Sequence, residues 1–470
     1  MPKQTRVSFV SLGCAKNLVD SEKMLGQLAE AGCAITADEN HADVTVINTC
    51  GFLDASRVEA DQVIREAVER KRTGTLKRVV VAGCLVQRDK EAILERVPGI
   101  DALVGVNNRD DIVRAVLGDE TGSAHHPNPE RKRRAATRNG APDLYLADYH
   151  PFVQIDTARL RLTPRHYAYL RISEGCDQKC TFCTIPSIRG PMHCKPPHIV
   201  LEEARELISD GVKEISLIGQ DTTSYGLGAD PLTTGLAGLL RMLDTVDGVG
   251  WIRLMYVYPS VFTDEMIDAI AESPRVCNYI DIPLQHINDR VLKAMHRRIN
   301  RRQTEELLQK IRDRIPGVTI RTTMIVGFPG ETQAEFNELK QFVSDFGFDA
   351  LGVFPYSLED NTPAGRMTGQ LSNEIKQERV DALMIAQQEV AFALADRHVG
   401  SSFEVLIDSV SPTGEVWSRH EGQAPMVDSA TRLDRCDAAP GEFLTVRCTG
   451  RDGYDLVARP VRQALRVLRA

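Results

Sequence analysis

Six of the eleven cysteines in this chain fall into two trios whose spacing suits metal binding. The compact trio has the spacing CxxxCxxC within the segment SEGCDQKCTFCTIP, and its members are Cys176, Cys180 and Cys183. The dispersed trio lies in the motifs SLGCAKN, INTCGF and AGCLVQ, and its members are Cys14, Cys50 and Cys84. Three thiolates leave one iron of a [4Fe–4S] cluster open for chemistry, whereas electron-carrying clusters normally take four cysteines. Two such sites on one chain predict an enzyme.

Zinc is the main alternative for the compact trio. Structural zinc usually takes four ligands in paired spacings, and no fourth ligand lies at such a spacing here. For the dispersed trio, the alternative is three buried cysteines that act as small hydrophobic residues. The other five cysteines have no spacing that suggests ligation: Cys33, Cys194, Cys277, Cys436 and Cys448.

Length and composition indicate a globular protein of about three domains. The chain has 470 residues, of which 42% are hydrophobic and 26% charged, and its formal net charge is −8. No apolar run approaches the ~18 residues that span a bilayer, and the first residues lack the features of a signal peptide. We therefore expect a cytoplasmic protein with no membrane partner, whose cysteines are ligands or free thiols. The negative charge does not favour a nucleic-acid partner.

Residues 1–117 alternate strand-like and helix-like segments, which is typical of a parallel α/β sheet. β-branched runs at residues 6–12, 44–48 and 79–82 each end just before one cysteine of the dispersed trio. Parallel strands bring their carboxyl ends to one edge of the sheet, where open α/β folds place their ligands. The three cysteines are therefore expected to converge in space.

Three further regions follow along the chain. Residues 118–165 read as a linker, with a basic cluster at 131–134 and no apolar period. Residues 166–398 contain six strand-like runs separated by helical patterns, at 167–172, 214–219, 251–257, 279–282, 319–326 and 350–355. Six βα units fall short of the eight of a closed barrel, so we expect an open, partial (β/α)6 barrel. Residues 399–470 predict a small antiparallel β-barrel with strands near 403–409, 415–418, 425–428, 443–449 and 454–458.

The compact trio, with Phe182 before its third cysteine, resembles the signature of the radical S-adenosylmethionine superfamily. The resemblance implies that the open iron binds the methionine moiety of S-adenosylmethionine, whose reductive cleavage yields a 5′-deoxyadenosyl radical. It also implies that the strand ends in EISLIGQD, DIPLQH and MIVGFPGET hold this cofactor, through Gly219, Gln220, Asp221, Gln285 and Gly327. Glycine admits close backbone approach, and the polar side chains can fix hydroxyl and amino groups. Each of these strand ends alone could be an ordinary turn.

The dispersed trio and its flanking residues resemble the amino-terminal domain of the methylthiotransferases, and the terminal β domain resembles their TRAM domain. In that family the three amino-terminal cysteines bind a second [4Fe–4S] cluster that serves in sulfur transfer. The resemblance implies that S-adenosylmethionine is both the radical source and the methyl donor, and that a reducing electron donor is required. No catalytic side chain beyond the cluster ligands is implied.

Two branches of this family compete as the specific assignment. One modifies adenosine in transfer RNA, and the other modifies the β-carbon of an aspartate in small-subunit ribosomal protein twelve. The sequence CAKNLVD after Cys14 resembles the second branch. Residues 400–470 hold nine Arg, no Lys and ten acidic residues, a balance that suits a basic protein better than RNA. A non-catalytic iron–sulfur carrier is a third interpretation.

Overall fold

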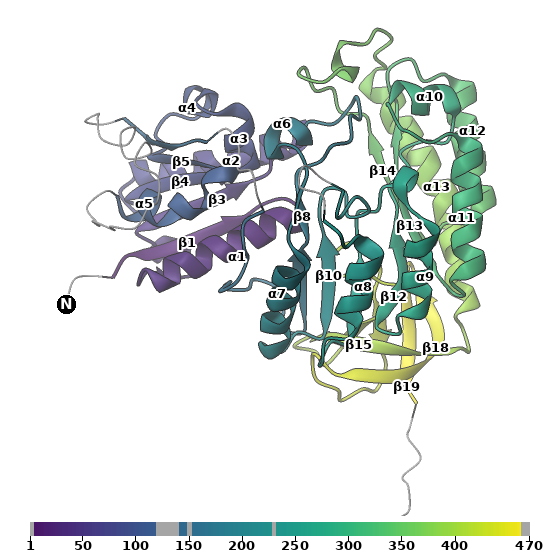
Figure 1. The fold of residues 1–470 in the computed structure, drawn as a ribbon. Helices are drawn as coiled ribbons and strands as arrows, with labels where there is room; N and C mark the ends of the chain where they lie inside the picture. Colours follow the sequence, from purple (N-terminus) through teal and green to yellow (C-terminus); the bar gives the residue numbers. More distant parts are fainter. Residues whose placement is uncertain (1–3, 119–140, 148–152, 228–231, 462–470) are drawn as a thin grey trace, which may run out of the picture.

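Two parallel sheets and a closed β-barrel follow one another along the chain in the computed structural model (Figure 1). The structure describes residues 4–118, 141–147, 153–227 and 232–461. None of the helices in these ranges is long and apolar enough to cross a membrane. The predicted parallel α/β, open partial barrel and small β-barrel architectures are confirmed.

The first sheet contains six parallel strands in the order β2-β1-β3-β4-β5-β6. They are β1 Arg6–Ser11, β2 Ala34–Ile35, β3 Val44–Thr49, β4 Arg78–Gly83, β5 Ala102–Gly105 and β6 Asp143–Tyr145. The helices are α1 Ala15–Glu30, α2 Asp54–Arg72, α3 Cys84–Asp89, α4 Ala92–Arg96 and α5 Ile112–Leu117, with single 3-10 turns η1 Glu39–His41 and η2 Val106–Asp111. Helices α1 and α5 pack on one face of the sheet, whereas α2, α3 and α4 pack on the other. Strand β3 is buried along its whole length because both faces are covered.

The region expected to be a linker contains ordered structure that the sequence did not predict. Strand β6 pairs in parallel with β5, and the segment 153–165 lies along α1, where the Leu160 amide donates to the Glu22 carbonyl at 3.1 Å. Polar side chains and backbone groups make most of these contacts. The region therefore has no apolar period from which either feature could be predicted. The basic cluster 131–134 lies outside the described residues. The domain limits 1–117, 118–165, 166–398 and 399–470 stay a prediction.

The central sheet is open, with six parallel strands in the order β14-β13-β12-β11-β10-β7. These strands are β7 Tyr167–Arg171, β10 Glu214–Ile218, β11 Trp251–Leu254, β12 Val276–Asp281, β13 Thr319–Val326 and β14 Ala350–Pro355. The helices packed on one face are α7 Pro197–Ser209, α8 Leu236–Asp244, α9 Asp264–Glu272, α11 Arg301–Arg314, α12 Gln333–Phe346 and α13 Asn373–Arg397. Shorter elements follow the strand ends: β8 Ser173–Glu174, α6 Ile185–Arg189, β9 His193–Cys194, η4 Pro259–Val261, α10 Asp289–Ala294 and η5 Ala364–Arg366.

The carboxyl-terminal barrel closes in the order β15-β16-β17-β19-β18. Its strands are β15 Ser402–Val410, β16 Val416–His420, β17 Thr431–Leu433, β18 Phe443–Asp452 and β19 Asp455–Pro460. The pairing is antiparallel except between β17 and β19, which run parallel. The strand expected at 425–428 is wrong, since this segment is a loop and the strand lies at Thr431–Leu433. In that loop Asp428 accepts a hydrogen bond from Tyr279 Oη of the central sheet at 2.7 Å, so tertiary contact overrides strand propensity.

The barrel packs against the amino ends of the central strands (Figure 1). Trp251, at the start of β11, meets Phe443 edge to face with ring centroids 5.0 Å apart. The buried Glu214, at the start of β10, accepts hydrogen bonds from Arg253 and from Arg419 of the barrel, both at 2.6 Å. Burial disfavours the Glu214 carboxylate, but the two guanidinium groups lower its pKa below the ordinary value. The barrel is therefore held at the edge opposite to the carboxyl ends of the strands.

Glu214→Gln should strongly destabilise the contact between the barrel and the sheet. The substitution keeps the shape but leaves the buried Arg253 guanidinium without its counter-charge and Arg419 with Asp408 alone, which costs roughly 3–5 kcal/mol. The urea midpoint of unfolding measures the loss. Glu306→Gln is the matched control because its ion pair with Arg302 is exposed, and it should change stability by less than about 0.5 kcal/mol. Equal midpoints for the two variants would contradict a structural role for the Glu214 charge.

Candidate functional site

The dispersed trio lies at the carboxyl ends of three neighbouring strands of the first sheet. Cys14 precedes α1, Cys50 follows β3 directly, and Cys84 follows β4 as the first residue of α3. Gly13, with a left-handed φ of +94°, brings the backbone so close that an added Cβ would lie 2.8 Å from Cys50 Cβ. Ionised Cys14 and Cys50 would both raise the pKa of Cys84, so the three thiols are electrostatic neighbours. The three cysteines therefore lie at one edge of the first sheet, and their convergence on one cluster stays a prediction.

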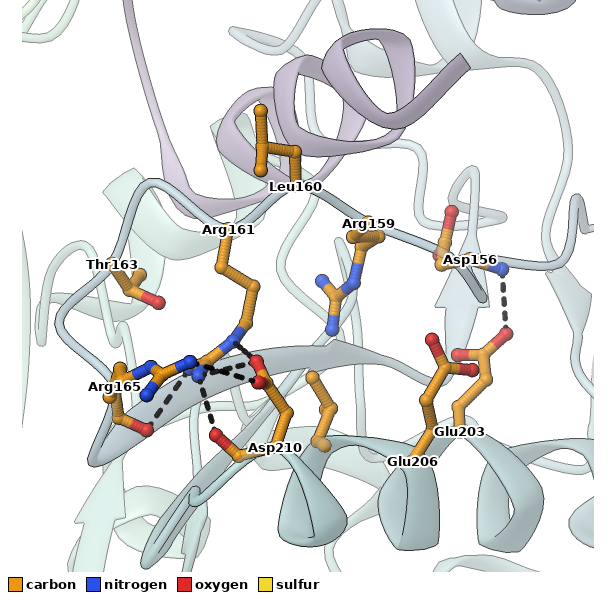
Figure 2. A pocket seen from close by; sticks show the side chains of 10 residues that line it. Asp156, Arg159, Leu160, Arg161, Thr163, Arg165, Glu203, Glu206 and Asp210 are labelled. Carbon is orange, nitrogen blue, oxygen red and sulfur yellow. Dashed lines mark hydrogen bonds and ion pairs between the residues drawn. The ribbon is translucent and has the colours of Figure 1, made fainter. Parts of the chain in front are cut away.

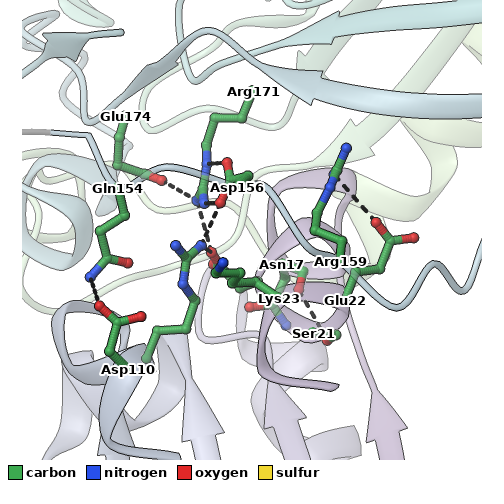
Figure 3. A network of polar contacts seen from close by, with 12 residues as sticks. Asn17, Ser21, Glu22, Lys23, Asp110, Gln154, Asp156, Arg159, Arg171 and Glu174 are labelled. Carbon is green, nitrogen blue, oxygen red and sulfur yellow. Dashed lines mark hydrogen bonds and ion pairs between the residues drawn. The ribbon is translucent and has the colours of Figure 1, made fainter. Parts of the chain in front are cut away.

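Side-chain amides fix the start of α1 against the end of β3. Asn48 Nδ2 donates to the Asn17 carbonyl at 2.9 Å and to Ser21 Oγ at 2.8 Å. Asn17 Nδ2 in turn donates to the Leu12 carbonyl at 2.6 Å. These bonds hold the turn that carries Cys14 over the strand that ends at Cys50, and Figure 3 shows Asn17 and Ser21 on this helix.

The acidity of the dispersed trio suits a soft metal centre. Burial raises the pKa of Cys84 to about 12 and also raises that of Cys50. Desolvation also disfavours the Cys14 thiolate. Lys16, Arg189 and backbone N–H groups outweigh this effect and lower the pKa of Cys14 below its ordinary value, and the residue is exposed to solvent. Buried thiols of high pKa become thiolates when a metal supplies positive charge. The donor set therefore fits iron and sulfide better than a free nucleophile.

The compact trio lies on the loop between β8 and α6. Its backbone is fixed where the Cys176 amide donates to the Gly190 carbonyl at 3.1 Å. Arg297 Nη1 donates to Cys180 Sγ at 3.6 Å, and its guanidinium lies 4.1 Å from the Tyr258 ring centroid. Burial raises the pKa of Cys176 and of Cys183 to about 12, and the neighbouring Cys180 contributes to both increases. Like the dispersed trio, the compact trio therefore offers buried thiols of high pKa that become thiolates when a metal supplies positive charge.

Among the described residues, no three His, Cys, Asp or Glu side chains converge as ligands of one metal ion would. A four-iron cube differs from a single ion because each thiolate binds its own iron, so the thiols stand apart.

The residues predicted to bind S-adenosylmethionine lie at the carboxyl ends of three central strands. Gly219, Gln220 and Asp221 follow β10, Gln285 lies beyond β12, and Gly327 follows β13. Gln220 Oε1 and Gln285 Oε1 are buried acceptors without a hydrogen-bond partner in the structure. Gln285 also has a left-handed φ of +74°, a strained backbone that is frequent at ligand sites. These orphaned acceptors fit a ligand rich in hydroxyl and amino groups.

Asp221 differs from the other members of this group because its carboxylate is already engaged. It accepts hydrogen bonds from Gln178 Nε2 at 2.9 Å and from Ser224 Oγ at 2.7 Å. Gln178 belongs to the loop of the compact trio. Asp221 therefore anchors that loop to the end of β10.

A buried network of charges, absent from the sequence-based prediction, joins the two halves of the site (Figure 3). Arg189 is the last residue of α6, six positions after Cys183, and its Nη2 donates to Cys84 Sγ of the first sheet at 3.1 Å. Lys16 makes a second link between the halves, with its ammonium 3.2 Å from the Tyr256 ring centroid at the end of β11. In the sequence, only the motif CAKN that begins at Cys14 points to Lys16. No motif distinguishes Arg189 from a surface arginine.

A separate pocket of about 340 Å³ lies between the segment 156–165 and helix α7 (Figure 2). Its lining carries both signs of charge, and Arg161 pairs there with Asp210 at 2.8 Å. Neither trio nor any strand-end residue named above lines this pocket. Its charges compensate one another, so it offers no chemistry comparable to that of the cysteine trios.

The sequence matches three known families, one for each of its three bodies, which are the first sheet, the central sheet and the barrel, each with its helices. Residues 6–105 match the uncharacterized protein family UPF0004, residues 170–343 the Radical SAM superfamily, and residues 399–461 the TRAM domain. The ribosomal protein uS12 methylthiotransferase RimO of Trichlorobacter lovleyi is 40% identical over 460 residues, covering 97% of this chain and 98% of that protein. RimO of Geobacter sulfurreducens is 39% identical over 454 residues, covering 96% and 98%.

This chain belongs to the RimO family. The resemblances to radical S-adenosylmethionine enzymes and to methylthiotransferases are thereby confirmed. Among solved structures, the radical S-adenosylmethionine methyltransferase TsrM of Kitasatospora setae aligns with a TM-score of 0.54 at 15% identity, covering 77% of this chain and 74% of TsrM. At this identity the likeness concerns the fold alone. The fold agrees with the match of residues 170–343 to the Radical SAM superfamily.

Gly13→Ala should disrupt the dispersed trio. The new Cβ would displace Cys50, whose Sγ lies 3.3 Å away. If each trio holds one [4Fe–4S] cluster, loss of this one lowers bound iron by roughly half. Iron and sulfide per chain after anaerobic reconstitution measure this effect. Gly32→Ala is the matched control, since Gly32 has a similar φ of +83° and no atom within 4 Å of the added Cβ. Equal iron loss in both variants would assign the effect to backbone strain.

Proposed function

We propose that this protein is a radical S-adenosylmethionine methylthiotransferase that adds a methylthio group to the β-carbon of an aspartate in ribosomal protein uS12. The names of its RimO relatives support the reaction class and the protein substrate. The structural observation that carries the proposal is the contact of Arg189 with Cys84 at 3.1 Å. It connects the helix that follows the compact trio directly to the dispersed trio, as a reaction requiring both sites demands.

The β-carbon of an aspartate is not acidic enough for a side-chain base to deprotonate it at neutral pH. A cofactor must therefore supply the difficult step, while the protein binds and orients the reactants. We assign one [4Fe–4S] cluster to each trio, with S-adenosylmethionine beside the compact one. Together, when bound, they supply hydrogen-atom abstraction, sulfur and a methyl group, and a cellular reductant supplies electrons.

The chain's own residues would hold these groups in place. Cys176, Cys180 and Cys183 each bring a thiolate from one loop, and Gln178 keeps that loop fixed to Asp221. The free acceptors of Gln220 and Gln285 belong to residues at the same strand edge and can bind hydroxyl or amino groups of the cofactor. Arg189 links the dispersed trio to the compact one, since it bonds to Cys84 and to Asp20 of the buried charge network. A fixed separation between the two sites favours transfer from one to the other.

Charge pairing in the barrel supports a protein substrate over transfer RNA. Arg419 pairs with Asp408 at 2.7 Å, and Arg451 pairs with Asp396 at 2.7 Å. Arg432 and Arg459 both lie within 4.0 Å of Asp434. These arginines already face carboxylates, whereas RNA binding relies on cations that are available to phosphates. A basic ribosomal protein suits this surface better, and such a substrate would place the enzyme in the cytoplasm.

The substrate assignment is tested with the reconstituted full chain, S-adenosylmethionine and a strong reductant without oxygen. Purified uS12 and bulk transfer RNA are supplied in separate reactions and analysed by mass spectrometry. We expect a methylthio group on one aspartate of uS12 and none on RNA. Modification of transfer RNA alone would overturn the substrate but keep the reaction class. Cluster binding without cleavage of S-adenosylmethionine would instead favour an iron–sulfur carrier.

Single cysteine variants should separate the two sites. Cys183→Ala should abolish cleavage of S-adenosylmethionine to 5′-deoxyadenosine, because the compact trio loses one of its three thiolates. Cys84→Ala should keep that cleavage but lose methylthio transfer to uS12. Chromatography of 5′-deoxyadenosine and mass spectrometry of uS12 measure the two activities. Cys33→Ala, a buried cysteine outside both trios, is the control and should retain both. Loss of cleavage in Cys84→Ala would contradict this division of roles.

A further inference from the structure

Arg189 occupies a singular position between the two proposed cluster sites. It is buried, belongs to the radical S-adenosylmethionine fold, and contacts a cysteine of the other body. Its Nη2 donates to Cys84 Sγ at 3.1 Å and to Asp20 Oδ2 at 3.0 Å. Its Nη1 donates to both carboxylate oxygens of Glu174, at 3.1 and 3.0 Å. One planar guanidinium thus serves a thiol and two carboxylates at once, which the single ammonium of lysine cannot reproduce in the same geometry.

The partners of Arg189 are themselves fixed, so the guanidinium has little freedom to move. Asp20 also accepts hydrogen bonds from Arg109 at 3.0 Å and from Arg171 at 2.8 Å. Glu174 accepts from Arg171 at 2.7 Å and from Gln220 Nε2 at 2.7 Å. The Gln220 bond leaves Oε1 of that side chain as the orphaned acceptor at the proposed cofactor site. A continuous chain of contacts therefore runs from Cys84 through Arg189 and Glu174 to Gln220.

We propose that Arg189 is a positioning residue through which the radical S-adenosylmethionine body sets the reduction potential of the cluster on the dispersed trio. This inference rests on the proposed function, because it requires a cluster at Cys14, Cys50 and Cys84. A hydrogen bond to a ligating sulfur and a nearby positive charge both stabilise the reduced cluster, which carries more negative charge. Arg189 supplies both to Cys84. Its removal should make the cluster harder to reduce.

The test isolates the dispersed cluster in the full chain. The background variant Cys176→Ala/Cys180→Ala/Cys183→Ala leaves only the dispersed trio to hold a cluster, and its midpoint potential is read by a redox titration monitored by electron paramagnetic resonance. Adding Arg189→Met should shift the potential to a more negative value at unchanged iron content. Arg189→Lys should shift it in the same direction but less, since it keeps the charge and loses the fork.

Arg159→Met in the same background is the matched control. Arg159 is also an arginine with a buried side chain between the two bodies, and it bonds to Glu22 at 3.3 Å and to the Tyr169 carbonyl at 3.0 Å rather than to a trio cysteine. It should leave the potential unchanged. An unchanged potential in the Arg189→Lys protein with its iron intact would overturn the proposal, even if Arg189→Met does not fold. An equal shift in Arg159→Met would also overturn it, because the shift would then report loosened packing.

Iron binding by the background variant separates a failure of the proposed function from a failure of the role of Arg189. If the background variant with native Arg189 binds no iron after reconstitution, the cluster on the dispersed trio is absent and that part of the proposed function fails. If it binds iron and Arg189 has no influence on the potential, the proposed function stands and only the role of Arg189 is lost.

Discussion

The structure depends on a buried set of ion pairs where the first and central sheets meet. Asp156 accepts hydrogen bonds from Arg109 at 2.8 Å and from Arg171 at 2.6 Å, and Asp20 bonds to both of these arginines and to Arg189. Burial disfavours both carboxylates, but the surrounding cations lower the pKa of each below the ordinary value. Burying so many charges is tolerated only when each is fully paired. A shift of one sheet against the other would leave charges unpaired, so the network fixes the relative position of the two cysteine trios.

The candidate site residues and the carboxyl-terminal barrel lie at opposite edges of the sheets. The cysteines, Gln220 and Gln285 lie beyond the carboxyl ends of parallel strands, where open α/β folds bind ligands. The barrel packs at the amino ends, through Glu214 and the pair of Trp251 with Phe443. A substrate can therefore approach the strand ends without displacing the contacts that hold the barrel. The exception is the loop that contains Asp428, which leaves the barrel and meets Tyr279 and Arg321 on the inner face of the sheet.

Local patterns predicted the sheets and the cysteine positions because strand periodicity, turn residues and cysteine spacing are properties of short segments. The network was beyond reach because its partners are distant in sequence: Asp20 and Arg189 are 169 positions apart, and Asp20 and Arg171 are 151 apart. An isolated Asp on an amphipathic helix is usually solvated, and only the packing of two bodies reveals it as buried. Strand β6 escaped prediction for a related reason, since three residues that complete an existing sheet need no strong propensity of their own.

The loop of the compact trio and the interface between the bodies are built from one continuous segment. Arg171 and Glu174 precede Cys176, and Arg189 follows Cys183, so charged residues of the network flank the three thiols on both sides. The Cys176 amide bonds to the Gly190 carbonyl, which closes this segment on itself next to Arg189. The segment that carries the compact trio therefore also supplies the arginines that bond to Asp20 of the first sheet. Arg189 bonds to Asp20 and to Cys84, so the end of this segment is fixed by the first sheet as well as by its own fold.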